Sequence, residues 1–201
     1  CFYLNLLKKF LLPLPNSFQD SEFGEIPKGW EVETLKEIAD VGSGKRPNEK
    51  SLFKTSEYNI PCYGSSKLDV YVKEALFEKP ILITGRVGTL GIIHRIFSPC
   101  FSSDNTLTFM VKNCVFYEYT YFCLKQIDFQ SYNRGTSQPL ITQTDMKNIK
   151  IIIPPQKILE SFSNSIKQFF KKIVENNSQI DTLTKTRDAL LPKLMSGEIR
   201  V

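Results

Sequence analysis

The chain has 201 residues, of which 41% are hydrophobic, and its 26 Lys and Arg outnumber its 21 Asp and Glu to give a formal net charge of +5. This length accommodates one domain of ordinary size, or one domain with an appendage, and is enough for a hydrophobic core. No run of about 18 apolar residues occurs, which excludes a membrane-spanning helix. The single His leaves His-based metal sites almost without support.

The cysteines are scattered and no Cys-x-x-Cys pair occurs, which argues against a zinc ribbon or a dithiol redox motif. An odd number of cysteines in apolar surroundings is typical of reduced, buried thiols. We therefore expect a cytoplasmic protein. The five are Cys1, Cys62, Cys100, Cys114 and Cys123.

The first 15 residues, CFYLNLLKKFLLPLP, are apolar with Lys8 and Lys9 in the middle. A signal peptide carries its charges before the apolar stretch and a small-residue cleavage site after it, and this segment has neither. We interpret residues 1–15 as the end of a helix that belongs to a preceding region. Residues 16–29 are polar, contain Pro and Gly, and are expected to form a loop.

The middle of the chain alternates short helical and strand-like segments. A short helix is expected at Leu35–Ala39, capped by Thr34, and the Gly- and Pro-rich basic loop 41–51 follows it. Apolar and aromatic residues at a helical period predict a second helix over Val115–Ile127, and residues 130–148 are expected to form a polar loop. Runs rich in Ile, Val, Thr, Tyr and Phe predict strands at Tyr58–Tyr63, Pro80–Thr84, Leu90–Phe97, Thr106–Val111 and Ile149–Ile153.

After Pro154-Pro155, apolar residues recur at alternating spacings of three and four. A repeat of about 3.5 residues indicates a helix that packs against another helix, and residues 156–191 would span roughly 54 Å. The fold class expected for the chain is therefore a mixed α+β globular domain followed by a long C-terminal coiled-coil helix. Two heptad positions are polar, Asn176 at a d position and Arg187 at an a position. Either these residues fix the register and the partner, or the seam is wet at both positions. The expected seam residues are Leu159, Phe162, Ile166, Phe169, Ile173, Asn176, Ile180, Leu183 and Leu190.

Several catalytic motifs fail on inspection. Ile153–Gln156 lacks the acid or amide and the aromatic residue of a methyltransferase tetrapeptide, and Gly42–Lys45 is too short for a P-loop. A metal-dependent nuclease needs paired carboxylates with a nearby Lys. No Glu-x-Lys occurs, and Asp145-Met146-Lys147 is the one Asp-x-Lys. A solvated charge pair explains this tripeptide better than a nuclease site. His94 lies in a strand-like run and is expected to be packed or to line a groove rather than to act as a base. We predict no catalytic residue and no metal ligand.

Nucleic-acid binding has better support, although a charge of +5 on this length is unremarkable and loops are polar in any case. Residues 79–103 and 129–144 contain no carboxylate, and Gly44-Lys45-Arg46 forms a third basic loop. Arg86, in the Gly-rich GRVGTLG, is a candidate for a phosphate or framework contact, and Arg134 and Gln138 are candidates for base reading. The candidate DNA-binding residues are Lys45, Arg46, Tyr63, Ser65, Ser66, Lys67, Arg86, Arg134 and Gln138.

The ordered series of segments resembles the specificity subunit of type I restriction–modification systems. SFQDSEFGEIPKGWEVETLKEIADVGSGKRP is similar to the stretch that leads into a target recognition domain, and IPCYGSSK with ILITGRVGTLG to the strands within one. NRGTSQPLITQTDMKNIKIIIPP resembles the exit into the conserved spacer helix, and ALLPKLMSGEIRV the usual C-terminal ending. The family usually carries two recognition domains and two spacer helices, so the chain resembles one half: a truncated product, an engineered piece or a natural half-subunit.

The resemblance implies residues 1–15 as the stub of a preceding spacer helix, 16–153 as the target recognition domain and 154–201 as the spacer helix and tail. It implies a non-catalytic subunit that recognises one half of a bipartite site in double-stranded DNA and scaffolds methyltransferase and restriction subunits. S-adenosylmethionine, Mg and ATP would be bound by those partners, and this chain would hold no cofactor. A second copy would pair through the spacer helix to give a homodimer.

Two other classes remain open from the sequence. One is a nuclease with a cryptic site, which metal-dependent cleavage by the isolated chain would support. The other is a coiled-coil interaction module whose globular domain binds protein or sugar, which absence of salt-sensitive DNA binding would favour.

Overall fold

A computed structural model describes residues 17–199 of the chain. The expectation for residues 1–15, and Cys1 with it, lies outside this range. The chain divides into two compact units, one up to Ser163 and one from Asn164 onwards. The first is a mixed globular unit and the second is helical, which confirms the predicted fold class.

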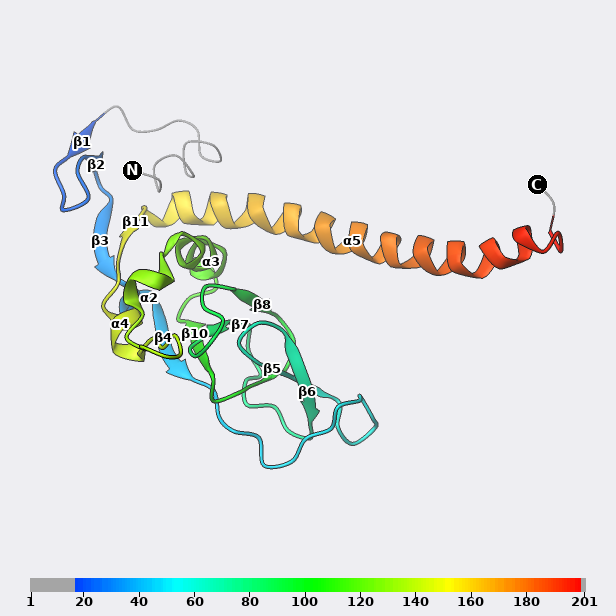
Figure 1. Ribbon diagram of the computed structural model, residues 1–201. Coiled ribbons are helices and arrows are strands. Elements are labelled where there is room, and N and C mark those ends of the chain that lie inside the picture. The colour runs from blue at the N-terminus through cyan, green and yellow to red at the C-terminus, as the bar shows by residue number, and fades with distance from the viewer. Residues whose placement is uncertain (1–16, 200–201) are drawn as a thin grey trace. The chain divides into compact units, whose positions relative to one another are not determined.

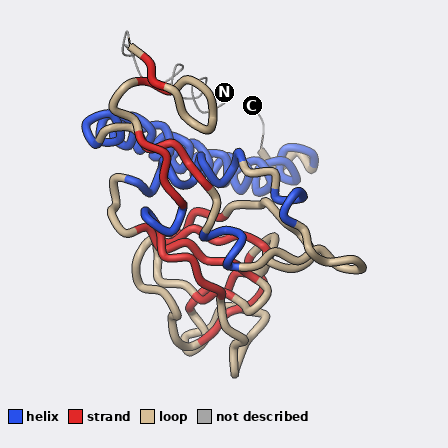
Figure 2. Tube along the Cα trace, turned by 90° about the vertical axis from the view of Figure 1, so that its left-hand side faces the viewer, coloured by secondary structure: helices blue, strands red, loops and turns tan. Residues whose placement is uncertain are grey.

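The main sheet of the globular unit has four antiparallel strands in the order β4 (Ala39–Ser43), β10 (Thr106–Val111), β7 (Ile81–Gly85) and β8 (His94–Ile96). Figure 2 shows the strands of the unit gathered beside one another. Every residue of β7 is buried, as expected for an inner strand rich in Ile and Leu. This strand is therefore part of the centre of the core.

A smaller sheet packs next to it, with β5 (Ile60–Tyr63) between β6 (Leu68–Val72) and β9 (Phe101–Ser102). β9 runs parallel to β5, while β6 forms an antiparallel hairpin with it. Apolar side chains from both sheets share one cluster, to which Tyr63 and Phe77 add partly buried rings. Its fully buried members are Ile81, Ile83, Ile96 and Cys100.

The first and last strands of the main body of the unit pair with each other. β3 (Glu31–Thr34) and β11 (Lys150–Ile153) are antiparallel, and a backbone hydrogen bond of 2.8 Å from Leu35 to Ile149 extends the pairing. The chain therefore leaves the globular fold beside the point at which it begins. Shorter elements complete the unit: β1 (Phe18–Gln19), β2 (Ile26–Pro27), α2 (Leu35–Ile38), η1 (Phe129–Tyr132) and α4 (Gln143–Lys147).

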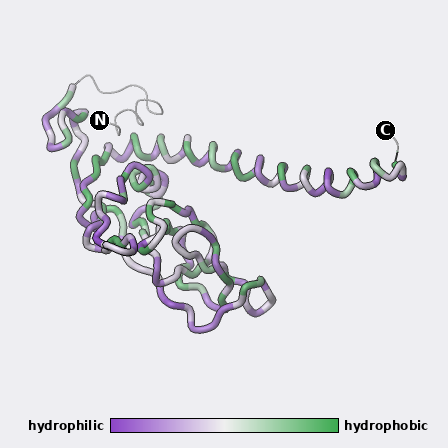
Figure 3. The backbone as a smooth tube through the Cα atoms, in the orientation of Figure 1, coloured by the Kyte–Doolittle hydropathy of each residue, from purple (hydrophilic) through white to green (hydrophobic). Residues whose placement is uncertain are grey.

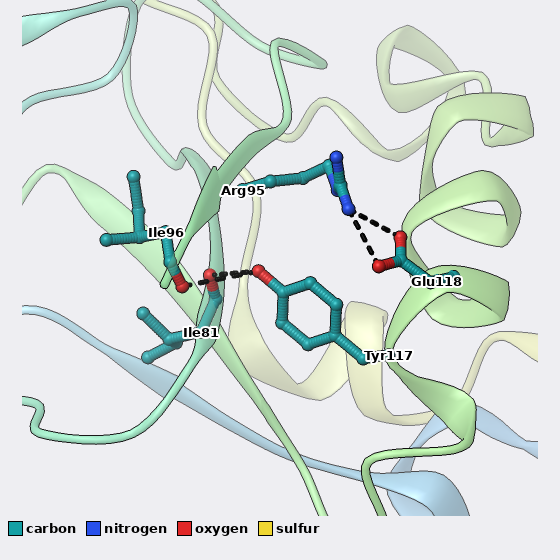
Figure 4. A network of polar contacts seen from close by, with 5 residues as sticks. All are labelled: Ile81, Arg95, Ile96, Tyr117 and Glu118. Atoms are coloured by element: carbon teal, nitrogen blue, oxygen red, sulfur yellow. Dashed lines mark hydrogen bonds and ion pairs between the residues drawn. The ribbon is translucent and has the colours of Figure 1, made fainter. Parts of the chain in front are cut away.

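One side of α3 (Phe116–Gln126) is fixed to the main sheet by polar contacts (Figure 4). The Tyr117 hydroxyl lies 3.1 Å from the carbonyl oxygen of Ile81 on β7 and 3.3 Å from that of Ile96 on β8. The Arg95 guanidinium donates to both oxygens of the Glu118 carboxylate, at 2.6 and 2.8 Å. The Arg95 and Glu118 side chains are only 12% and 2% exposed, so this is a buried ion pair.

The next turns of α3 hold the end of the globular unit. Tyr119 donates its hydroxyl proton to the carbonyl oxygen of Ile152 on β11. The ring of Phe162 packs edge-on against Tyr119 and Phe122, with centroid separations of 6.2 and 5.8 Å. Leu159 and Phe162, two expected seam residues, are therefore buried within the globular unit.

Helix α5 (Gln156–Met195) has 40 residues, equivalent to about 60 Å (Figure 1). Among the described residues, no helix is long and apolar enough to cross a membrane. Hydrophobic and hydrophilic segments alternate along it (Figure 3). The helix was predicted to end before Pro192, which was wrong: Pro192 lies inside the last turn. Near a C-terminus the ring removes only one of the last backbone hydrogen bonds, so the helix continues.

The predictions of α2, β5, β7, β10, α3, β11 and α5 are confirmed to within a few residues at their ends. The strand predicted at Leu90–Phe97 is shorter, because Gly88 and Gly91 have positive φ and residues 86–93 form turns. The loops predicted at 16–29, 41–51 and 130–148 were partly wrong. The first contains β1 and β2, the second contains the end of β4, and the third contains most of η1 and all of α4. Thr34 stands at the N-cap position of α2, but its side chain forms no capping hydrogen bond.

The predicted burial of the cysteines holds for three of them. Cys62, Cys100 and Cys123 are buried, and burial raises the pKa of the first two thiols to about 11 and that of Cys123 to about 12. Cys114 is exposed, which contradicts the prediction, because it lies in the turn before α3.

We expect the Arg95–Glu118 pair to be essential for stability. Glu118→Ala would leave a buried guanidinium without its carboxylate and should lower the free energy of unfolding by about 3–5 kcal/mol, measured by urea denaturation. Glu22 and Lys150 form an exposed ion pair and provide the control. Glu22→Ala should change the free energy by less than about 1 kcal/mol. An equally small loss for Glu118→Ala would contradict the burial of the pair.

Candidate nucleic-acid interface

The turn formed by residues 102–106, Ser-Ser-Asp-Asn-Thr, binds three loops that carry candidate DNA-binding residues. The amide of Lys45 donates to the turn at 2.8 Å, the amide of Arg86 donates to it at 2.8 Å, and the carbonyl of Tyr63 accepts from it at 3.0 Å. We call this segment the 102–106 turn. It brings together loops that are up to 41 residues apart in the sequence, counted from Lys45 to Arg86.

Strand register explains why these loops meet. Ser43 at the end of β4 pairs with Leu107, and Gly85 at the end of β7 pairs with Thr106 at the start of β10. The last residues of β4 and β7 and the first residue of β10 therefore lie at the same end of the sheet. Gly44 passes the 102–106 turn so closely that a Cβ there would lie 2.2 Å from two of its carbonyl oxygens, which explains the glycine before Lys45.

The segment from Tyr63 to Lys67 forms the tight turn between β5 and β6. The Gly64 amide donates to the carbonyl of Lys67 at 2.9 Å, and the Ser65 side chain lies beside Gly85. The Tyr63 ring is half-buried, with its centroid 5.9 Å from that of His94. Ser66 and Lys67 are exposed, so they are the members of this turn that a ligand can reach most easily.

The two acid-free segments of the sequence lie side by side. The amide of Ile141 donates to the carbonyl of Arg86 at 3.0 Å, and the amide of Gly88 donates to that of Pro139 at 3.1 Å. Arg86 is half-buried, and its Nε has no hydrogen-bond partner among the described residues. Gln138 is exposed on the neighbouring loop, so the structure places Arg86 and Gln138 on adjoining loops.

The Asn133 side chain closes the loop that carries Gln138. Its Oδ1 accepts hydrogen bonds from the amides of Gly135 and Leu140, both at 2.9 Å. The amide of Arg134 donates to the carbonyl of Leu140 at 2.9 Å, and a Cβ on Gly135 would lie 1.8 Å from the carbonyl oxygen of Gln138. The backbone from residue 133 to 140 is therefore fixed by its own contacts.

Arg134 is engaged by a carboxylate that lies just outside the acid-free segment. Its guanidinium pairs with Asp145, while the arginine side chain remains 65% exposed. Burial opposes ionisation of Asp145, but hydrogen bonds from Thr142 and Arg134 outweigh it and hold the pKa of that carboxyl below its usual value. Thr142 and Asp145 also form a capping box that begins α4.

His94 lies beside the Tyr63–Lys67 turn, with its ring centroid 5.9 Å from that of Tyr63. Burial lowers the pKa of His94, against an opposing hydrogen bond to the Ser66 backbone, and its Nε2 has no partner among the described residues. Within residues 17–199, no group of three His, Cys, Asp or Glu could hold a metal ion. A hollow of about 440 Å³ beside the 102–106 turn mixes charges, since Arg46 and Lys50 line it together with Asp69 and Asp104.

The sequence pointed to Lys45, Tyr63, Arg86 and Gln138 but missed the groups that hold their loops in place. The 102–106 turn carries no motif, because its role depends on strand register. The signature Thr-x-x-Asp of the capping box at Thr142 and Asp145 was present in the sequence and could have been found. Asn133 has no such signature, because its side-chain oxygen accepts hydrogen bonds only from its own loop.

The globular unit is thus an α+β domain with polar and basic loops at one end of its main sheet, and the long amphipathic helix α5 follows it in the chain. The model of the family described as "Type I restriction modification DNA specificity domain" matches residues 27–187, and the chain belongs to this family. The resemblance stated from the sequence is thereby confirmed.

Relatives agree with this assignment. The chain is similar to the MjaIX specificity subunit of Methanocaldococcus jannaschii, at 32% identity over 98% of this chain and 52% of the relative. The HindI specificity subunit of Haemophilus influenzae is 22% identical over 87% of this chain and 42% of its own length. The crystal structure of the S subunit from M. genitalium shares the fold, with a TM-score of 0.70, 20% identity, and coverage of 92% of this chain and 48% of that one. The chain thus spans about half the length of these relatives.

We expect Asn133 to set the rigidity of the loop that carries Gln138. Asn133→Ala removes the shared acceptor and should speed hydrogen exchange at the Gly135 and Leu140 amides by about two- to tenfold, since one hydrogen bond is worth about 0.5–1.5 kcal/mol. Asn133→Asp retains an oxygen at the same position and should leave exchange nearly unchanged. Residue-resolved NMR makes the measurement, and equal acceleration in both variants would contradict the role of the acceptor.

Proposed function

We propose that this chain is a non-catalytic specificity subunit that reads one half of a bipartite sequence in double-stranded DNA. The observation that carries the proposal is the convergence of the Lys45, Tyr63 and Arg86 loops on the 102–106 turn, with the Gln138 loop bonded beside them. Such a surface combines cations for phosphates with amide and hydroxyl groups for base edges. The names of the relatives support it.

The contacts suggest a division of roles among the candidates. Lys45, Arg46 and Lys67 are exposed and suit phosphate contacts. Gln138 stands on a loop whose backbone is fixed, and its amide can form a bidentate contact with adenine. Arg134 forms an ion pair with Asp145. It would therefore either stabilise the loop through this pair or leave Asp145 to contact a DNA phosphate or base.

The partners we propose are methyltransferase subunits, which would bind S-adenosylmethionine, and restriction subunits, which would use Mg and ATP. This chain would supply sequence recognition and a scaffold. Catalysis would take place on those partners, and the absence of a catalytic motif in the sequence agrees with that division.

We further propose that two copies of the chain associate through α5. Large apolar residues on one stripe of the helix are exposed to between 42% and 67%: Ile173, Ile180, Leu183 and Leu190. A second copy related by a twofold axis could bury this stripe, and closed dimers are the commonest symmetric assembly. Two antiparallel copies would place two recognition domains on a symmetric bipartite target.

We expect base readers and phosphate contacts to respond differently to substitution. Gln138→Ala should weaken binding to the recognised duplex by about 1–3 kcal/mol and leave binding to unrelated duplexes unchanged. Lys67→Ala should weaken binding to all duplexes and reduce the slope of log affinity against log salt by about one. Fluorescence anisotropy over a salt series, with a methyltransferase subunit present, measures both. A Gln138→Ala protein with unchanged discrimination would contradict the assignment.

Association should depend on the apolar stripe of α5. Ile173→Asp places a charge in the proposed seam and forfeits about 1.5–3 kcal/mol of burial in each copy. Sedimentation velocity should therefore show a large shift towards monomer. Ser178→Asp, on the opposite face of the same helix, is the control and should leave the dimer intact. A monomer of the unsubstituted chain at micromolar concentration would refute the proposal.

A further inference from the structure

The loop between β4 and β5 ends in an exposed apolar tip. It is the cyan loop that extends past β6 in Figure 1. Leu52 and Phe53 are 74% and 77% exposed, more than any other large apolar side chain among the described residues of the globular unit. Together they form a small contiguous apolar patch at the end of a projecting loop, and exposed apolar patches can mark contact sites.

The base of the tip is tied to the β5–β6 hairpin. Ser51 and Tyr71 exchange two backbone hydrogen bonds of 2.8 Å, and the Ser51 hydroxyl contacts both the amide and the carbonyl of Phe53. Thr55 and Tyr58 close a second turn on the returning side. The tip is therefore a structured projection with its side chains directed outwards.

An ionic clamp holds the two arms of the loop together. Lys73 on the neighbouring segment lies 2.6 Å from Glu49 and 2.7 Å from Glu57, and the Tyr58 hydroxyl donates to Glu49 at 3.0 Å. The hydrogen bonds from Lys73 and Tyr58 lower the pKa of Glu49. Lys73 thus binds both carboxylates at the base of the loop, where the three charged side chains leave one net negative charge.

The two charged side chains next to the tip itself are both lysines, although Lys50 also lines the hollow that contains Asp69 and Asp104. Lys50 and Lys54 flank Leu52 and Phe53, both are exposed, and neither has an ion pair within residues 17–199. An apolar pair between two lysines that form no direct ion pair matches a nucleic acid, whose phosphates attract the lysines while its stacked bases accept apolar side chains. A purely apolar protein surface would gain nothing from the lysines.

The base of the tip is held on the same β5–β6 hairpin as the Tyr63–Lys67 turn of the candidate interface. The segment Tyr63–Lys67 lies at the start of β6, and Tyr71, which holds the tip, lies three residues after Leu68 on that strand. Three residues of strand span about 10 Å. That is about three base-pair steps of duplex DNA.

We propose that Leu52 and Phe53 form an apolar wedge that inserts between base pairs and kinks the duplex, with Lys50 and Lys54 on the flanking phosphates. Apolar wedges of Leu and Phe kink duplexes in this way, by about 20–90°. The inference rests on the proposed DNA-binding function and adds a contact that reads DNA deformability rather than base edges.

The test compares DNA bending by the full chain and its variants. A target duplex selected from random sequences, with donor and acceptor dyes at its ends, reports bending by energy transfer, while anisotropy reports affinity. The unsubstituted chain should bend the duplex. The doubly substituted Leu52→Ser, Phe53→Ser chain should lose the bend and at least about tenfold in affinity. Both side chains are exposed, so an unchanged melting temperature should confirm that this variant folds.

Phe53→Trp is the conservative control. It should retain the bend, and its exposed indole should be quenched by stacking when DNA binds, whereas Trp30, the single Trp of the natural sequence, is buried. Lys50→Ala with Lys54→Ala should weaken binding and reduce the salt slope by about two while a bend persists at saturation.

Three results would overturn the wedge. The doubly serine-substituted chain could bend DNA as before, while Lys67→Ala still weakens binding; the wedge would then be wrong and the DNA-binding function would stand. The serine variant could bind and bend DNA normally but lose a methyltransferase subunit, which would make the tip a protein contact. The unsubstituted chain could fail to bind any duplex in a salt-dependent way, which would refute both the wedge and the proposed function.

Discussion

The globular unit depends on the way in which α3 is bound on two sides at once. Tyr117 and Glu118 fix one side to β7 and β8, through two backbone carbonyls and the buried pair with Arg95. Tyr119 and Phe122 hold β11 and Phe162 on the other. A buried carboxylate tolerates little displacement of its partner. Loss of this one helix would therefore separate the sheet from the first turns of α5.

The candidate interface follows from strand register rather than from any local motif. β4 and β7 end, and β10 begins, at the same end of the sheet. The 102–106 turn connects the loops there through backbone groups. The bonds from the turn to Lys45 and Arg86 use backbone atoms, so they do not depend on which side chains stand at these positions. Substitution of these side chains can therefore change the surface that the loops present without disturbing the backbone bonds that connect them.

The long helix serves two structural purposes along its length. Leu159 and Phe162 follow the heptad repeat but are buried in the globular unit, while Ile173, Ile180 and Leu183 remain exposed. One continuous repeat thus supplies both a contact within the globular unit and an exposed apolar stripe. The sequence pattern is the same in both parts, because any apolar surface on one face of a helix gives the same period.

The sequence alone determined the elements whose signal is local. The heptads of α5, the β-rich runs at β7 and β10 and the period of α3 were readable because each element shows its buried face in its own residues. Short edge strands such as β6 and β9 were not, since pairing partners far along the chain decide them. The ion pair of Arg134 with Asp145, and the meeting of four loops beside Thr106, were decided by tertiary structure alone. Contacts between distant residues depend on strand register and packing, which leave no periodic trace in the sequence.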